Sequence, residues 1–280
     1  MLTRPLPDLS AWINHFRKAE IPVLPSTIEE LALLRQAEEQ RGCVDAKMIS
    51  QSVGSDPLMA LRVLIEAARR RPDTVVTDAE TVTAAVVMMG IDPFFGAFTT
   101  LESVATRLEG QVPAMLGLQR VLKRAWRSAN FALGFAVHRM DEDAAVVQTA
   151  ALLHDFAEML LWCHAPELAL RIQALQRADA ALRSSAAQRE VLGIELQDLE
   201  QGLMKVWRLP GLLIRMTDDK TAHHPQTRTV MLAVRVARHT QDGWDTPGAQ
   251  ASLPDDLTDL GELLSLSPEA TLHLLHDIDS

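Results

Sequence analysis

Apolar side chains recur every three or four positions through most of the chain, which is the spacing of a helix face. In the segment "PSTIEELALLRQAEEQ", Ile28, Leu31 and Leu34 mark one such face, and Ser26 and Thr27 before it are N-cap candidates. No segment alternates apolar and polar residues as a half-buried strand does, and no fixed-period repeat is present. The pattern therefore predicts an all-α fold.

Capping and helix-breaking residues divide this pattern into separate helices. Asp45 precedes one helix, and Pro57 begins the next after the break "GSDP". Asp78 is the expected cap of a helix that ends at Gly90, and Ser267 caps the last helix of the chain. One long helix is expected from about residue 113 to 139, followed by another that contains all of "DEDAAVVQTAALLHDFAEMLLWC".

The stretch "EGQVPAM" is the strongest candidate for a boundary between two lobes. A second turn-rich stretch, "QDGWDTPGAQASLPDD", is expected to form a loop. The predicted organisation is an N-terminal extension over residues 1–20, an N-terminal helical lobe over 21–111, and a C-terminal helical lobe over 112–280 with a loop at about 241–255.

Composition narrows the class of protein. Apolar residues make up 48% of the 280 residues and aromatic residues only 4%, with no Tyr, so packed helices with an aliphatic core are expected. The net charge of −10 argues against direct binding of nucleic acid. The two cysteines form no disulfide framework, and the chain shows neither the apolar core of a signal peptide nor a run of 18 apolar residues. These features predict a cytoplasmic protein that does not cross a membrane.

One adjacent pair, His154 and Asp155, interrupts the apolar run "AALLHDFAEMLL". A neutral imidazole and a carboxylate suit a divalent metal, but a catalytic metal needs about three protein ligands and an open position. The alternative is a buried polar pair that is hydrogen-bonded within the protein. The pair by itself does not decide between these interpretations.

Several segments, taken in order, resemble one known family. The N-terminal part carries "IPVLPSTIEELALL", "VDAKMISQSVGSDPLMALRVLIEAA" and "TVTAAVVMMGID", and the central part carries "LKRAWRSANFALGFA", "LLHDFAEMLL" and "REVLGIELQDLEQGLMKVWRLP". From about Ile21 to at least His239, these segments resemble the HDOD domain, a branch of the HD superfamily of metal phosphohydrolases. The resemblance implies a two-lobed helical fold with an HD-like C-terminal core.

The resemblance also implies where an HD hydrolase would hold its metal. The first ligand would be a His in "AWRSANF", which contains none, and the distal Asp falls at Arg235. A guanidinium beside a divalent ion is unfavourable, so Arg235 is expected to pair with Asp155 instead. His154 and Asp155 are therefore interpreted as remnants in a metal-free core, with no cofactor and no catalysis. His223 and His224 are compared with a family His-His pair, and their spacing leaves that match open.

A cluster of basic residues on the long helix is the main candidate for a binding surface. Arg120, Lys123, Arg124 and Arg127 follow helical spacing and are expected to form one basic stripe. Together with Arg235, they are the predicted contacts for an acidic partner or a phosphate-bearing ligand. The alternative is a solvated face paired with nearby acidic residues.

The predicted function is that of a bacterial signal-transduction protein. The resemblance implies a non-catalytic, regulatory HDOD module that acts by binding protein partners. One alternative is a divergent metal phosphohydrolase that acts on nucleotides, with missing ligands from His164, His223, His224 or a second chain. The other is a metal-free sensor that binds a nucleotide in the remnant HD cavity, where Arg235 would contact phosphate.

Overall fold

The computed structural model describes residues 1–72, 78–179 and 181–279. Within these residues the chain is all-α, and the one β interaction is an isolated parallel bridge between Val23 and Ser103. The predicted fold class is confirmed. The chain divides into two compact units, which are described separately: unit 1 comprises Met1–Val121 and Asp155–Pro210, and unit 2 comprises Leu122–His154 and Gly211–Ser280.

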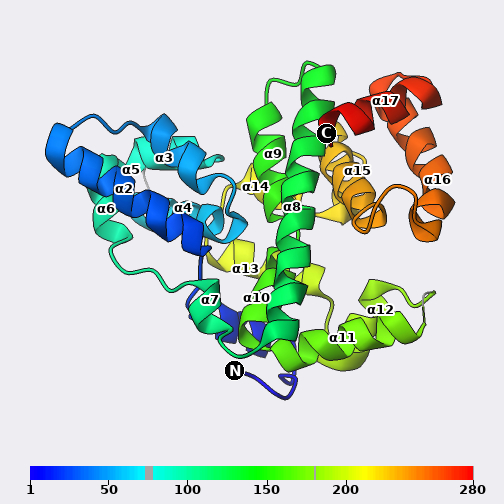
Figure 1. The fold of residues 1–280 in the computed structure, drawn as a ribbon, viewed down its shortest axis with the longest axis horizontal. Helices are drawn as coiled ribbons and strands as arrows, with labels where there is room; N and C mark the ends of the chain where they lie inside the picture. Colours follow the sequence, from blue (N-terminus) through cyan, green and yellow to red (C-terminus); the bar gives the residue numbers. More distant parts are fainter. Residues whose placement is uncertain (73–77, 180, 280) are drawn as a thin grey trace. The chain divides into compact units, whose positions relative to one another are not determined.

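Unit 1 contains the N-terminal helices and a second group from the middle of the chain (Figure 1). Its first group is α1 (Leu9–Phe16), α2 (Pro25–Arg41), α3 (Ala46–Val53), α4 (Pro57–Arg70), α5 (Val82–Met89), α6 (Ile91–Ala97) and α7 (Val104–Arg107). Its second group is α10 (Phe156–His164), α11 (Pro166–Ala178), α12 (Ser184–Leu192) and α13 (Leu196–Val206). Helix α4 packs on α5 and α10, and α13 packs on α1 and α10.

Unit 2 is built from α9 (Ala144–Leu153), α14 (Gly211–Met216), the short 3-10 helix η1 (Asp219–Thr221), α15 (Pro225–His239), α16 (Pro247–Leu264) and α17 (Pro268–Ile278). Helix α15 packs on both α9 and α16, and Figure 1 shows α16 leading into α17. The long helix α8 (Val112–His138) begins in unit 1 and continues into unit 2.

Local capping chemistry explains several helix starts. Asp45 accepts a hydrogen bond from the backbone N–H of Met48, and Asp56 precedes α4, which begins at Pro57. Gly90 ends α5 with a φ of 81°, as expected for a glycine stop.

Two predicted caps are wrong. The cap of α5 is Thr81 rather than Asp78. Helix α2 begins at Pro25 without a side-chain cap, because Thr27 donates its hydroxyl hydrogen to the buried Asp56 instead.

The division into two compact units differs from the predicted lobe boundary at residues 111 and 112. Residues 112–121 belong to unit 1 because Gly117 lies against Trp162 of α10, where a Cβ at position 117 would meet the indole at 2.3 Å. The predicted extension over 1–20 is also part of unit 1. Trp12 and Phe16 are fully buried, and the Trp12 indole donates to the carbonyl of Leu192.

Two further predictions are corrected in the second half of the chain. The loop expected at about 241–255 is shorter, because Thr246 caps α16 and Pro254 lies inside that helix. The helix expected through the His-Asp pair is divided into α9 and α10. Together they make the stretch Ala144–His164 long and apolar enough to cross a membrane, with a mean hydropathy of 1.3 over 18 residues. Of that window, 72% is buried inside the protein, which is typical of a core helix in a soluble protein.

Candidate functional site

His154 lies at the junction between α9 and α10, with its side chain buried among apolar neighbours. Its Nε2 is 3.0 Å from Oδ1 of Asp219 in η1, and both residues belong to unit 2. The imidazole is therefore hydrogen-bonded to a carboxylate 65 residues away. Asp219 was not among the predicted site residues, since nothing in "MTDDK" indicates this contact.

The ligand set around His154 is small. Among the residues that the structure describes, no group of three or more His, Cys, Asp or Glu side chains is placed to hold a metal ion. His223 and His224 contact each other with tilted rings whose centroids are 4.2 Å apart, on an exposed loop before α15. His164, another predicted source of a ligand, donates from its ring to the carbonyl of Glu20.

Arg235 is part of an ion-pair cluster between α15 and α16. Its guanidinium lies 2.7 Å from Oδ1 of Asp256 and 2.6 Å from Oδ2 of Asp259. Asp256 is buried and also contacts Nδ1 of His239 at 2.7 Å. Within unit 2, the charge of Arg235 is therefore directed to α16, and the expected pair with Asp155 stays a prediction.

The predicted basic stripe on α8 is not a continuous exposed surface. Arg120 and Lys123 are exposed, whereas Arg124 and Arg127 are buried. The guanidinium of Arg127 donates to both carboxylate oxygens of Asp279 at 2.7 Å, and also to the hydroxyl of Thr240. The stripe is divided because two of its four residues are buried, and Asp279 near the end of the chain covers Arg127.

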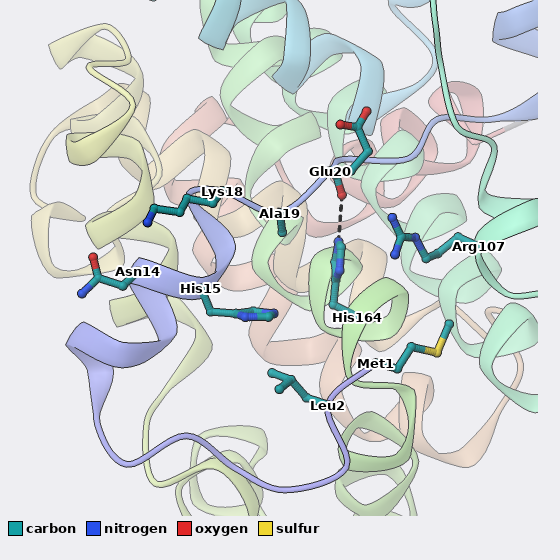
Figure 2. Close-up of a pocket in the computed structure, with 9 residues that line it drawn as sticks. All are labelled: Met1, Leu2, Asn14, His15, Lys18, Ala19, Glu20, Arg107 and His164. Atoms are coloured by element: carbon teal, nitrogen blue, oxygen red, sulfur yellow. Dashed lines mark hydrogen bonds between the residues drawn. The ribbon is translucent and has the colours of Figure 1, made fainter.

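Unit 1 contains a cavity of about 500 Å³ that the sequence did not predict. It is lined by Met1, Leu2, Asn14, His15, Lys18, Ala19, Glu20, Arg107 and His164. Figure 2 shows His15 and Arg107 pointing toward His164 from opposite sides, while Lys18 and Asn14 extend away from it. The lining residues come from the first two residues of the chain, α1, the segment after α1, α7 and α10, so no single motif indicates the cavity.

Both histidines of this cavity have a pKa below the ordinary value for histidine. Burial, and then the positive charge of Arg107, lower the pKa of His164 to about 4. Burial also lowers the pKa of His15. Because a carbonyl only accepts, the hydrogen bond of 2.8 Å between Nε2 of His164 and the carbonyl of Glu20 places the proton on Nε2.

Nucleophilic chemistry by the neighbouring thiol is disfavoured. Cys163 is buried, and desolvation raises the pKa of its thiol to about 12. The thiol therefore stays protonated at neutral pH, and His164 beside it in sequence is committed to Glu20. The residues that line this cavity are therefore suited to binding polar groups.

Comparisons with known proteins agree with the fold. A family model described as HDOD domain matches residues 21–224, which is most of the chain. A response regulator, MmoQ from Methylococcus capsulatus str. Bath, is similar in structure, with a TM-score of 0.64 and 19% identity over 91% of this chain and 98% of that one. A virulence factor from Campylobacter jejuni subsp. jejuni has a TM-score of 0.67 and 18% identity over 97% of this chain and 98% of that one. A search of curated proteins finds no match.

Proposed function

Because the chain belongs to the HDOD domain family, we propose that it is a non-catalytic regulatory protein of a bacterial signalling system. It acts in the cytoplasm by binding a protein partner. The observation that carries this proposal is the pairing of His154 with Asp219 in a core where no third potential metal ligand joins them among the described residues. A response regulator among the structurally similar proteins supports a role in signalling.

The positive charge of Arg235 supports the proposal that the protein is non-catalytic. The family resemblance places this residue where a hydrolase would have its distal Asp, and the guanidinium is instead ion-paired with Asp256 and Asp259. A divalent ion near such a cation would be repelled. The same ion pairs disfavour the alternative in which Arg235 contacts the phosphate of a bound nucleotide.

We expect the purified protein to contain no stoichiometric metal, because a His-Asp pair is too small a ligand set for a tightly bound divalent ion. The measurement is elemental analysis of protein prepared without chelator, before and after incubation with Mn²⁺, together with an assay of p-nitrophenyl phosphate hydrolysis. The matched control is His154→Ala, which removes the imidazole of the pair. Stoichiometric Mn²⁺ in the wild type that is lost in this variant, with hydrolysis that is lost alongside, would support the divergent phosphohydrolase instead.

A partially apolar face on the C-terminal half of α8 is the proposed docking surface for the protein partner. Trp126 is 50% exposed and Val137 is 61% exposed, and the eleven-residue spacing puts them on one side of the helix. Met140, which follows the helix, is 87% exposed. Exposed aromatic and aliphatic side chains of this size are typical of protein interaction sites, and Lys123 on the same helix favours a partner whose apolar face has an acidic edge.

Replacing Trp126 and Val137 together by serine is expected to abolish capture of the partner without unfolding the protein, because neither side chain is in the core. The measurement is crosslinking and mass spectrometry in lysate of the native host, comparing wild type and Trp126→Ser, Val137→Ser. Leu33→Ser on α2 is the control, since Leu33 is similarly exposed at 67%. If Leu33→Ser reduced capture of the partner as much as the double variant does, this surface would be ruled out. The same conclusion would follow if the double variant captured the partner as well as the wild type does.

A further inference from the structure

We propose that the cavity of unit 1 lined by His15, Lys18 and Arg107 binds a small organic anion with acidic groups at both ends. This site lies outside the residues on which the proposed function rests, and it would give a regulatory protein a small-molecule input. The inference follows from the charge of the lining, from polar groups that have no protein partner, and from the size and shape of the cavity.

The charge of the lining favours an anion. Lys18 is exposed at the rim and has no ion-pair partner among the residues that the structure describes. Arg107 is paired with Glu102, but its Nε is buried and has no hydrogen-bond partner in the described part of the chain. Glu20 is the acidic residue of the lining, and its carboxylate is ion-paired with Arg62. Figure 2 shows that this carboxylate points away from His164, so the cavity itself is electropositive.

Several polar groups that face this cavity are not satisfied by the protein. The ring nitrogens of half-buried His15 have no hydrogen-bond partner within residues 1–72, 78–179 and 181–279. Nε of Arg107 is buried and likewise has no hydrogen-bond partner in the described part of the chain. Leaving polar groups unpaired in a partly buried site is unfavourable, and convergent polar groups in a cavity are typical of a ligand site.

The walls of the cavity are held in place. His164 is anchored through its ring to the carbonyl of Glu20 and through its own carbonyl to the backbone N–H of Leu2 at 2.7 Å. His15 lies edge-on to His164, with ring centroids 6.3 Å apart, and beside it Phe16 is fully buried. A site with fixed walls binds a ligand without a large ordering cost.

Size and arrangement define the class of ligand. A volume of about 500 Å³ is within the range of small-molecule sites, and the apolar side chains of Leu2 and Ala19 fit a carbon skeleton. In Figure 2, Lys18 and Arg107 lie on opposite sides of Ala19 and His164. Two separated cations favour a ligand with carboxylate or phosphate groups at both ends over a single inorganic anion.

The test is a thermal-shift titration at constant ionic strength with citrate, fructose 1,6-bisphosphate and inorganic phosphate. Any affinity tag belongs at the C-terminus, because residues 1 and 2 line the cavity. At least one organic anion is expected to raise Tm by several degrees, since a ligand that binds only the folded state stabilises it by mass action. Inorganic phosphate should give a smaller shift. The absence of a shift with both organic anions would overturn the proposal.

Two variants separate this site from general ionic effects. Lys18→Gln is expected to weaken binding of the organic anion by about tenfold or more, corresponding to one lost charge-assisted contact. Lys47→Gln, which removes an exposed lysine of α3, should leave the affinity unchanged. Equal effects of the two substitutions would show that binding is non-specific and would also overturn the proposal.

The histidine resonances report directly on whether the anion binds in this cavity. The bound anion is expected to raise the pKa of His15, because it adds negative charge to a site whose facing charged and titratable groups are His164, Lys18, Arg107, the paired Glu20 and the ammonium group of Met1. Titration of the imidazole resonances in a ¹⁵N-histidine-labelled sample, with and without citrate or fructose 1,6-bisphosphate, measures this change. A ligand that shifts Tm but leaves the His15 resonances unmoved binds elsewhere, and that result would refute the assignment.

Discussion

Replacing Asp56 by alanine is expected to lower the free energy of unfolding by about 3–5 kcal/mol. The carboxylate is fully buried and accepts hydrogen bonds from the backbone N–H groups of Leu24, Leu58 and Met59 and from the hydroxyl of Thr27. Two of these donors belong to the start of α4, and the other two lie 29 and 32 residues earlier. The substitution removes the N-cap and leaves buried donors without a partner.

The comparison that isolates this effect is Asp45→Ala. Asp45 also caps a helix, with its carboxylate 2.8 Å from the backbone nitrogen of Met48, but it is exposed. Its loss is expected to cost only about 1 kcal/mol, the usual contribution of an N-cap. Urea denaturation at pH 7 measures both variants. A cost for Asp56→Ala that does not exceed the cost for Asp45→Ala would mean that the contacts of Asp56 with Leu24 and Thr27 contribute nothing.

Asp56 also shows which part of the fold the sequence predicts. The break "GSDP" and the start of a helix at Pro57 were predicted because cap and proline signals act within a few residues. The contacts of the same carboxylate with Leu24 and Thr27 were not predicted, since they join segments about thirty residues apart. Periodicity and capping therefore give the helices and the all-α class, but not the division into two discontinuous units.

The candidate sites were predicted from the sequence even less well than the fold, because their contacts also join distant segments. Helical spacing correctly places Arg124 and Arg127 on one helix, but it does not reveal that both are buried or that Arg127 is paired with the distant Asp279. Asp219 was missed because its contact with His154 depends on how η1 packs. The partners of Arg235 on α16 were not predicted because they depend on how α16 packs. The cavity near His15 and His164 carries no motif, since it is formed where segments about 150 residues apart meet.

Replacing Arg127 by methionine is expected to lower the free energy of unfolding by about 3 kcal/mol, because it leaves the carboxylate of Asp279 without its partner in a largely buried position. The side chains of Arg127 and Asp279 are only 7% and 18% exposed, and two parallel hydrogen bonds of 2.7 Å join them. Burial by itself would raise the pKa of Asp279, but the hydrogen bonds from Arg127 and Trp244 hold that pKa below its ordinary value.

The pH dependence of this cost has a definite sign. A carboxyl group with a lowered pKa in the folded state stabilises the protein above its unfolded pKa of about 3.8, and that contribution is lost as the pH falls further. The difference in stability between wild type and Arg127→Met should therefore be fully present at pH 7 and narrow below about pH 4. Urea denaturation of both proteins across this range, for as long as they remain folded, measures it.

Lys123→Met is the comparison, because Lys123 is a basic residue of the same predicted stripe that is exposed and acts on Asp279 only through its charge, without a hydrogen bond. It is expected to change stability by no more than about 0.5 kcal/mol, as usual for a surface substitution. A double-mutant cycle with Asp279→Asn should show that the two single costs are not additive, since both remove the same ion pair. If Arg127→Met instead left stability unchanged, Arg127 would be available to bind an acidic partner, as its position on the helix had predicted. A large loss of stability would make Arg127 a structural residue that fixes the C-terminal end of unit 2 to α8.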